Sequence, residues 1–145
     1  MSEASPQRGN TQDRNAVRVL VVDDDPTNRI VARAILGRFG CAVEFAENGE
    51  DAVRMVAEGD YDLVFMDCMM PVMDGFHATQ AIRANELRGR NSHTPIIALT
   101  ALCRPEDRQH CLDVGMDDFI SKPARAEVFR QVIDRWKQPD RCPRD

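Results

Sequence analysis

Five residues that can do metal and phosphate chemistry stand directly after short apolar runs of the sequence. Three are acids: Asp23 and Asp24 follow one run, and Asp67 follows another. A hydroxyl, Thr100, and an amine, Lys122, follow two further runs. If these runs are parallel strands, their carboxyl ends meet at one edge of a sheet, and the five side chains converge there. This convergence, rather than any single residue, is the evidence for a functional site.

The chemistry that such a set supports is the binding of Mg²⁺ and phosphate. Three carboxylates in one pocket repel each other unless positive charge compensates them. Mg²⁺ prefers oxygen ligands, commonly one or two carboxylates together with waters and phosphate oxygens. Each residue also has a simpler interpretation, because an Asp after a strand is often a helix cap or turn residue. We expect that simpler role for Asp25, which precedes Pro26.

The elements that must position these side chains alternate along the chain. Segments with helical periodicity follow each apolar run, bounded by capping residues, prolines and glycines. This alternation predicts an α/β fold with helices on both faces of an open parallel sheet, and five units fit the flavodoxin-like (βα)5 strand order 2-1-3-4-5. Periodicity alone leaves other small α/β folds open. The predicted strands are Val17–Val22, Ala42–Ala46, Leu63–Met66, Ile96–Leu99 and Asp118–Ile120.

Length and composition indicate one globular domain. The chain has 145 residues, of which 43% are hydrophobic, and a net charge of −5, which gives no broad attraction to nucleic acid. We expect a flexible leader at residues 1–15, the domain at 16–137 and a short tail at 138–145. No apolar run reaches the roughly 20 residues that span a bilayer. Five cysteines without a C-x-x-C pair suggest reduced thiols, so we expect a cytoplasmic protein without a membrane partner.

Four segments together resemble the receiver domain of response regulators in two-component signalling. They are V-L-V-V-D-D-D-P-T-N-R, V-F-M-D-C-M-M-P-V-M-D-G-F, I-I-A-L-T-A and F-I-S-K-P, in the family's order and at its spacing. The resemblance covers about Val17 to Trp136. The amino-acid sequences of the first two segments most resemble those of receivers in hybrid histidine kinases. The resemblance implies a phosphorylation-dependent switch that does not turn over an external substrate.

The resemblance also implies roles for individual residues. Asp67 is the phosphoacceptor, which takes a phosphoryl group from a phosphohistidine of a sensor kinase or a histidine phosphotransfer protein. Asp24, Asp67 and the backbone carbonyl of Met69 ligate Mg²⁺, and Asp23 holds a metal-bound water. Lys122 pairs with the phosphoryl group.

The switch itself is implied to be Thr100 and Phe119. Thr100 bonds a phosphoryl oxygen, Phe119 moves with it, and the small Ala101 leaves room. Receivers that dephosphorylate quickly often carry a polar side chain two residues after the acceptor or two after the threonine. Here those positions are Met69 and Leu102, neither of which can orient a water by hydrogen bonding, so we expect slow self-dephosphorylation.

Two surfaces are candidates for protein partners. The helix that begins at Pro26 is more apolar than a half-buried helix requires. Deep packing explains this, and so does docking of a histidine-bearing helical partner on Arg29, Ala32, Arg33 and Leu36. A homodimer could form through the fourth helix, the fifth strand and the fifth helix, the face on which receivers usually dimerise or signal.

Three other functions compete with the switch. Asp23-x-Asp25-x-Thr27 fits the D-x-D-x-T motif of haloacid-dehalogenase-like phosphatases, with Asp23 as nucleophile and Asp25 as general acid, although the chain is short for that family. A flavin-binding flavodoxin-like module is disfavoured, because three aspartates after the first strand would repel the flavin phosphate. A receiver that has lost phosphorylation is disfavoured because the acids, the hydroxyl and the amine are all retained.

Overall fold

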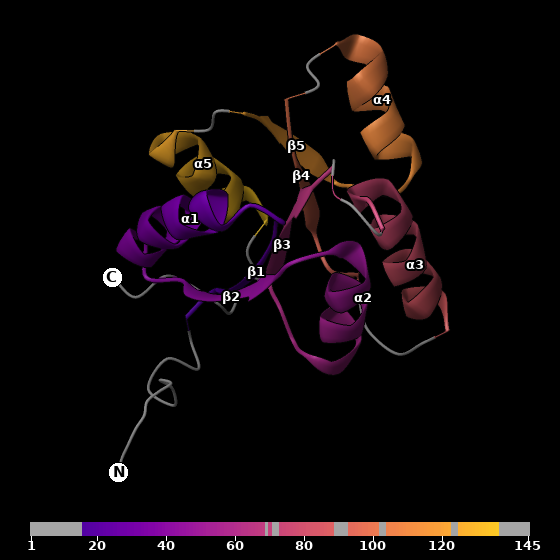
Figure 1. Ribbon diagram of the computed structural model, residues 1–145, viewed down its shortest axis with the longest axis horizontal. Helices are drawn as coiled ribbons and strands as arrows, with labels where there is room; N and C mark the ends of the chain where they lie inside the picture. Colours follow the sequence, from indigo (N-terminus) through magenta and orange to yellow (C-terminus); the bar gives the residue numbers. More distant parts are fainter. Residues whose placement is uncertain are drawn as a thin grey trace.

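The computed structural model describes residues 16–68, 70, 73–88, 93–101, 104–122 and 125–136. In these ranges five parallel strands form one sheet in the order β2-β1-β3-β4-β5, with five helices around it (Figure 1). The predicted fold class and strand order are therefore confirmed. The elements are β1 Arg18–Val22, α1 Pro26–Arg38, β2 Ala42–Ala46, α2 Gly49–Glu58, β3 Leu63–Asp67, α3 Gly75–Leu87, β4 Ile96–Thr100, α4 Pro105–Asp113, β5 Asp118–Ser121 and α5 Ala126–Trp136.

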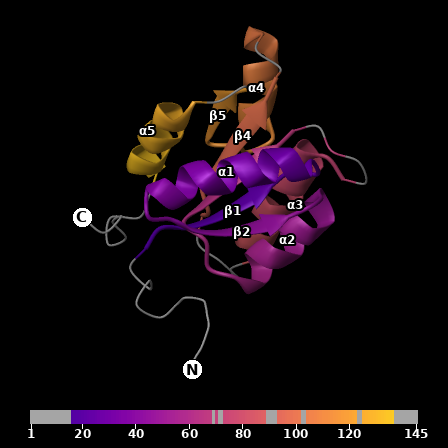
Figure 2. The ribbon, with the colours of Figure 1, turned by 60° about the vertical axis from the view of Figure 1, so that its left-hand side comes forward.

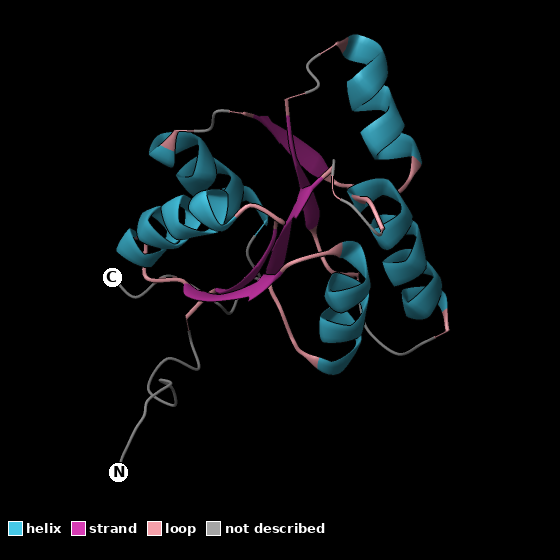
Figure 3. Ribbon diagram, in the orientation of Figure 1, coloured by secondary structure: helices cyan, strands magenta, loops and turns pink. Residues whose placement is uncertain are grey.

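The sheet lies between two layers of helices (Figure 3). Helices α1 and α5 cover one face, where Leu36 and Ile133 pack against Phe65 of the central strand. Helices α2, α3 and α4 cover the other face, where Ile82 and Cys111 belong to a second core cluster. Successive residues of each strand point to opposite faces, so the strand residues divide between the two cores.

The three central strands are buried on both faces because their sequences are continuously apolar. Strands β3 and β4 are buried at every position, and β1 at every position after Arg18. The outer strands β2 and β5 are only partly buried. Burial therefore explains why three of the five predicted strands lack the alternation of a half-exposed strand.

Helix starts lie just beyond the carboxyl ends of the strands. The Asp25 carboxylate accepts the Thr27 N–H at 2.9 Å and caps α1, with Pro26 in the first turn. Asn48 and Asp74 cap α2 and α3 in the same way. The simpler interpretation of Asp25 as a cap is confirmed. These caps satisfy amide groups that have no partner within the helix.

Several sequence expectations fall on residues that the structure does not describe. The leader at 1–15 and the tail at 138–145 lie outside the described residues, so the domain limits stay a prediction. Among the described helices, none combines the length and apolarity needed to cross a membrane.

A nearly buried ion network joins α3 to the segments that precede β4 and β5. The Arg83 guanidinium donates to the backbone carbonyls of Thr94 at 2.8 Å and Gly115 at 2.9 Å. It also donates to the carboxylates of Glu86 at 2.9 Å and Asp117 at 2.7 Å. The side chains of Arg83, Glu86 and Asp117 are only 16%, 9% and 14% exposed, so water cannot replace these bonds well. The network holds the amino edge of the sheet together.

We predict that Arg83→Ala lowers the free energy of unfolding by about 3 kcal/mol, because the poorly hydrated carboxylates of Glu86 and Asp117 lose the guanidinium charge that balances them. They retain the backbone N–H groups of Thr94 and Ile96 as donors, but these carry no compensating charge. The midpoint and slope of urea unfolding measure this loss.

The matched control is Arg54→Ala in α2, whose pairs with Asp51 and Glu58 are exposed and contribute less than about 1 kcal/mol. Equal losses for the two variants would contradict the importance of the network.

Candidate functional site

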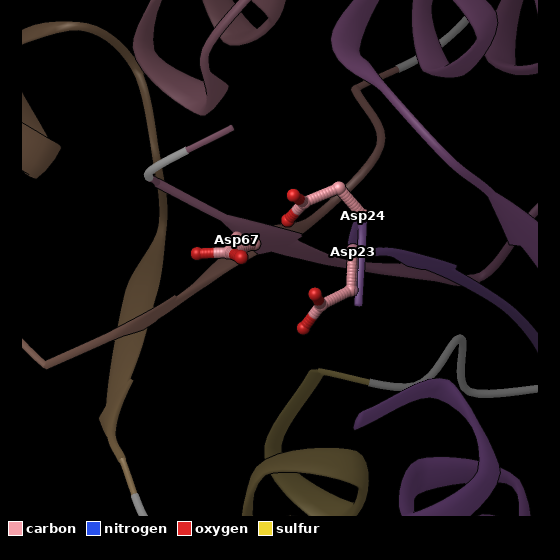
Figure 4. Close-up of side chains that lie close together, drawn as sticks. All are labelled: Asp23, Asp24 and Asp67. Carbon is pink, nitrogen blue, oxygen red and sulfur yellow. The ribbon is translucent and has the colours of Figure 1, made fainter. Parts of the chain in front are cut away.

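Three carboxylates gather at the carboxyl edge of the sheet. Asp23 and Asp24 follow β1, Asp67 ends β3, and β1 and β3 are hydrogen-bonded neighbours. One oxygen from each of the three side chains lies within 4.8 Å of the others (Figure 4). Asp23 and Asp67 are buried at 1% and 6% exposure, whereas Asp24 is exposed. The predicted convergence of the acids is therefore present in the structure.

Lys122 supplies positive charge to this cluster. It follows β5, and its Nζ lies 3.4 Å from Oδ2 of Asp67 and 3.5 Å from Oδ2 of Asp23. Its backbone N–H donates to the Thr100 carbonyl at 2.8 Å, which fixes the start of the loop after β5. One lysine faces three carboxylates, so the cluster keeps an excess of negative charge that a divalent cation would neutralise.

Hydrogen bonds to two elements hold Asp23 in place. Oδ1 of Asp23 accepts the backbone N–H of Asp25 at 2.9 Å, and the Asp23 carbonyl accepts Nη1 of Arg29 at 2.7 Å. The Asp23 N–H donates to the Ala46 carbonyl at 3.1 Å. These bonds tie Asp23 to both α1 and β2. Asp23 is therefore a fixed acceptor, which suits a residue that orients a water or a cation from one side.

The two switch candidates lie on neighbouring strands. Thr100 ends β4 and is 2% exposed, and Phe119 of β5 is partly buried against the core that includes α4. The Arg108 guanidinium of α4 lies over the Phe119 ring, with Cζ 4.6 Å from the ring centroid. Such a contact stabilises the ring on the surface side. Two further positions, Met69 and Leu102, were the basis for expecting slow self-dephosphorylation. Both lie outside the described residues.

One glycine that the sequence interpretation missed lies against the end of β3, beside Asp67. Gly75 opens α3, and its N–H donates to the Cys68 carbonyl at 3.2 Å. A Cβ at this position would lie 2.4 Å from the Asp67 carbonyl oxygen and 2.9 Å from Cγ of Met66. Helix α3 can therefore approach the end of β3 only without a side chain. The Asp-Gly pair at the helix start is the signal that could have indicated it.

Two buried thiols border the site on the α4 side. Cys68 follows Asp67, and Cys111 lies in α4; they are 0% and 3% exposed. Cys68 and Cys111 belong to the same buried core cluster. Burial raises the pKa of both thiols above the ordinary cysteine range, so they are protonated at neutral pH. The described cysteines carry free thiols.

The expected docking face on α1 needs a correction. Ala32 and Leu36 are 5% and 0% exposed and pack in the core beneath α1, so deep packing accounts for these two residues. The Arg29 guanidinium donates a hydrogen bond to the Asp23 carbonyl and is only partly exposed. Arg33 is the exposed member of the predicted set. The large apolar residues that α1 exposes are instead Ile30 at 69% and Val31 at 50%.

Comparison with known proteins identifies the class. The sequence model of one protein family, the response regulator receiver domain, matches residues 19–134. The chain therefore belongs to this family. It is 42% identical over 121 residues to the sensor protein GacS of Pseudomonas syringae pv. syringae, covering 83% of this chain and 13% of that relative. This chain thus spans about an eighth of that relative.

Two solved structures are similar over most of the chain. The receiver domain of the sensor histidine kinase PA1611 from Pseudomonas aeruginosa, with magnesium coordinated in its active site cleft, has 39% identity and a TM-score of 0.76, covering 83% of this chain and 97% of that one. The receiver domain of Ssk1 from Saccharomyces cerevisiae, in complex with the histidine phosphotransfer protein Ypd1, has 29% identity and a TM-score of 0.80, with 84% and 89% covered.

The comparisons confirm two expectations. The likeness to receivers of hybrid histidine kinases is confirmed, because similar relatives include a hybrid signal transduction histidine kinase of Dictyostelium discoideum and a similar solved structure is the receiver domain of a sensor histidine kinase. The expected Mg²⁺ site is supported, because Asp23, Asp24 and Asp67 offer the oxygen donors that Mg²⁺ requires and the similar PA1611 receiver coordinates magnesium in its active site cleft.

We predict that Gly75→Ala destabilises the protein by about 2 kcal/mol, because its Cβ would overlap the Asp67 carbonyl. The displaced Asp67 should also bind Mg²⁺ more weakly, which calorimetric titration measures. Gly37→Ala in α1 is the control, since nothing lies within 4 Å of its Cβ. There the higher helix propensity of alanine should stabilise the protein by about 0.5–1 kcal/mol. Stabilisation by both substitutions would show that α3 does not abut the end of β3.

Proposed function

We propose that Asp67 accepts a phosphoryl group from the phosphohistidine of a histidine kinase or histidine phosphotransfer protein. A carboxylate oxygen of Asp67 attacks phosphorus, a P–O bond forms, and the P–N bond to the donor imidazole breaks. The observation that carries this proposal is the buried carboxylate of Asp67 at the strand end, 3.4 Å from the Lys122 ammonium and beside two further acids.

The side chains around Asp67 would then serve charge neutralisation. Phosphoryl transfer depends mainly on positioning and on compensating charge on the phosphoryl oxygens. Lys122 lies between Asp23 and Asp67, so its ammonium can follow the negative charge from the free carboxylate to the phosphoryl group. Asp24 and Asp67, together with the backbone carbonyl of Met69, would hold Mg²⁺, and Asp23 would act through a water. Bound Mg²⁺ supplies further positive charge to the phosphoryl oxygens.

The output of the switch is proposed to arise from Thr100 and Phe119. A phosphoryl group adds about −1.5 to −2 charges and strong acceptor oxygens, toward which the Thr100 hydroxyl can turn. The space that Thr100 leaves admits the Phe119 ring, which must then leave the Arg108 guanidinium that now lies over it. The surface of α4, β5 and α5 would change as a result, and pairing with a second copy through this face would be controlled by the same event.

The donor is proposed to dock on the exposed apolar side of α1, which Figure 2 shows lying across the sheet. A phosphohistidine must reach Asp67 from beyond the carboxyl edge. Val31 lines a cavity of about 520 Å³ together with Asp23, Ala101 and Lys122. Val31 is therefore beside the entrance to the site, and Ile30 is its exposed neighbour in the chain. A histidine phosphotransfer protein is the partner in the similar Ssk1 complex.

The first experiment measures intact mass after incubation with acetyl phosphate and Mg²⁺. Wild type should gain one phosphoryl group, and Asp67→Asn should gain none, because an amide is not a nucleophile. Chelation of Mg²⁺ should suppress the gain. Decay of the adduct in the same samples tests the expectation of a long-lived phosphoryl group, which a half-life of seconds would contradict.

Asp23→Asn separates the switch from the phosphatase alternative. In the proposed function this variant retains the acceptor and gains a phosphoryl group, although more slowly. Absence of an adduct on wild type, together with hydrolysis of a phosphate ester that Asp23→Asn abolishes, would favour the phosphatase.

We predict that the double variant Ile30→Ser, Val31→Ser lowers kcat/KM for transfer from a phosphorylated histidine phosphotransfer protein at least tenfold, because anchoring apolar contacts are lost. Phosphorylation by acetyl phosphate should be unchanged, since the small donor needs no docking surface. Leu87→Ser is the control: Leu87 is 88% exposed, but it ends α3 on the opposite face of the sheet. A similar loss in the control, or no loss in the double variant, would rule out this docking face.

A further inference from the structure

Arg29, in the first turn of α1, is hydrogen-bonded twice to the loop that carries two of the acids. Its Nη1 donates to the backbone carbonyl of Asp23 at 2.7 Å, and its own backbone N–H donates to the carbonyl of Asp25 at 3.1 Å. Asp24 lies between these two acceptors in the chain. The Arg29 side chain is only 17% exposed, so water competes poorly for its bond. One residue therefore holds the backbone on both sides of Asp24.

Three successive peptide groups around Asp23 and Asp24 are hydrogen-bonded. The Asp23 N–H donates to the Ala46 carbonyl at 3.1 Å, and the Asp25 N–H donates to Oδ1 of Asp23 at 2.9 Å. The peptide between Asp23 and Asp24 is held through its carbonyl by Arg29. The donor of this bond is charged, which makes it stronger than a bond between neutral groups. The tether on the middle peptide is a side chain, so a substitution can remove it.

The direction of the Asp24 carboxylate depends on this peptide. Asp24 is exposed, so packing does little to hold its side chain, and its position follows from the backbone. In the proposed function Asp24 binds Mg²⁺ directly and Asp23 acts through a water. Mg²⁺ demands near-ideal octahedral coordination and tolerates misplaced ligands poorly. A rotation of the peptide between the two acids would displace one acid relative to the other and weaken the binding of the ion.

We propose that Arg29 is a positioning residue of the Mg²⁺ site, which sets the relative placement of Asp23 and Asp24 through the carbonyl of Asp23. This inference rests on the proposed function, which assigns Asp24 to the metal. It replaces the partner-docking role that the sequence predicted for Arg29. A purely electrostatic role has the opposite sign, because a positive charge near a cation site weakens binding and its loss alone would tighten it.

The test is calorimetric titration of the unphosphorylated protein with Mg²⁺ alone and with Ca²⁺ alone. Arg29→Met keeps an apolar stem but removes the donor and the charge. Its Mg²⁺ affinity should fall about tenfold, as for other residues that orient metal ligands. Ca²⁺ accepts irregular coordination, so its affinity should fall less than about threefold. A Mg²⁺ affinity within about threefold of wild type, or equal losses for the two ions, would overturn the proposal.

Two controls separate the hydrogen bond from the charge. Arg38→Met removes the same charge from the exposed far end of α1. Glu47→Gln removes the 73% exposed carboxylate that lies 3.9 Å from Nη2 of Arg29. Both variants should keep the Mg²⁺ affinity within about twofold of wild type, because interactions of exposed charges are weak and screened. A loss in either control equal to that in Arg29→Met would assign the effect to charge and overturn the proposal.

Unfolding and phosphorylation complete the test. The urea midpoint at several Mg²⁺ concentrations gives the same affinity from the unfolding equilibrium, so Arg29→Met is informative even when it is only partly folded. Wild type that binds Mg²⁺ but gains no phosphoryl group from acetyl phosphate refutes the proposed function, and the titrations still test Arg29. Slower transfer from a histidine phosphotransfer protein to Arg29→Met, at wild-type Mg²⁺ affinity, would return Arg29 to partner docking and refute the positioning role alone.

Discussion

The structure depends on one electrostatic constraint, the mutual repulsion of three carboxylates at one edge of the sheet. Asp23, Asp24 and Asp67 lie within 4.8 Å of one another, and a single lysine partly neutralises them. Two of these acids are almost fully buried, where unpaired charge is costly. The rest of the fold must therefore hold the acids in place, and it does so with the cap at Asp25, the bonds to Asp23 and the close seat of α3 at Gly75. The uncompensated negative charge favours a divalent cation at this edge of the sheet.

At the amino edge of the sheet, nearly buried carboxylates are instead neutralised by a partner within the chain. There Arg83 satisfies two carboxylates and two carbonyls in nearly buried surroundings, so charge and hydrogen bonds are balanced within the chain. The amino edge is therefore stabilised by balanced charges, and the carboxyl edge keeps the carboxylates that are not balanced. The parallel topology makes this division possible, because all strand ends of one kind lie on the same side. It also explains why the three acids and Lys122, which follow three different strands, converge although they are far apart in sequence.

The sequence was sufficient for the sheet and for the acids, because both follow from local patterns. Continuous apolar runs identified the central strands, and the residue after each run identified the site. The orientation of α1 was not predictable in this way. Ile30, Val31, Ala32, Ile35 and Leu36 are all apolar, so periodicity does not say which of them face the sheet; the cap at Asp25 and the bond from Arg29 to Asp23 fix the rotation of the helix. The Arg83 network joins segments distant in sequence, and no local pattern indicates it.

The pleat of the central strands separates the two sides of the site. Asp23 and Lys122 line a cavity with Val31 and Phe129 on the α1 and α5 side, where a phosphoryl donor would approach. Cys68 and Cys111 belong to the core on the α4 side, against which Phe119 packs, where the proposed response occurs. Neighbouring residues of β3 point to opposite faces of the sheet. A conformational change at Asp67 can therefore reach the other face through the backbone of β3 alone. Thr100, at the end of the adjacent strand, is the group that would turn toward a phosphoryl oxygen in the proposed function. In that proposal, input and output occupy different faces of a small domain and share Asp67 as the acceptor.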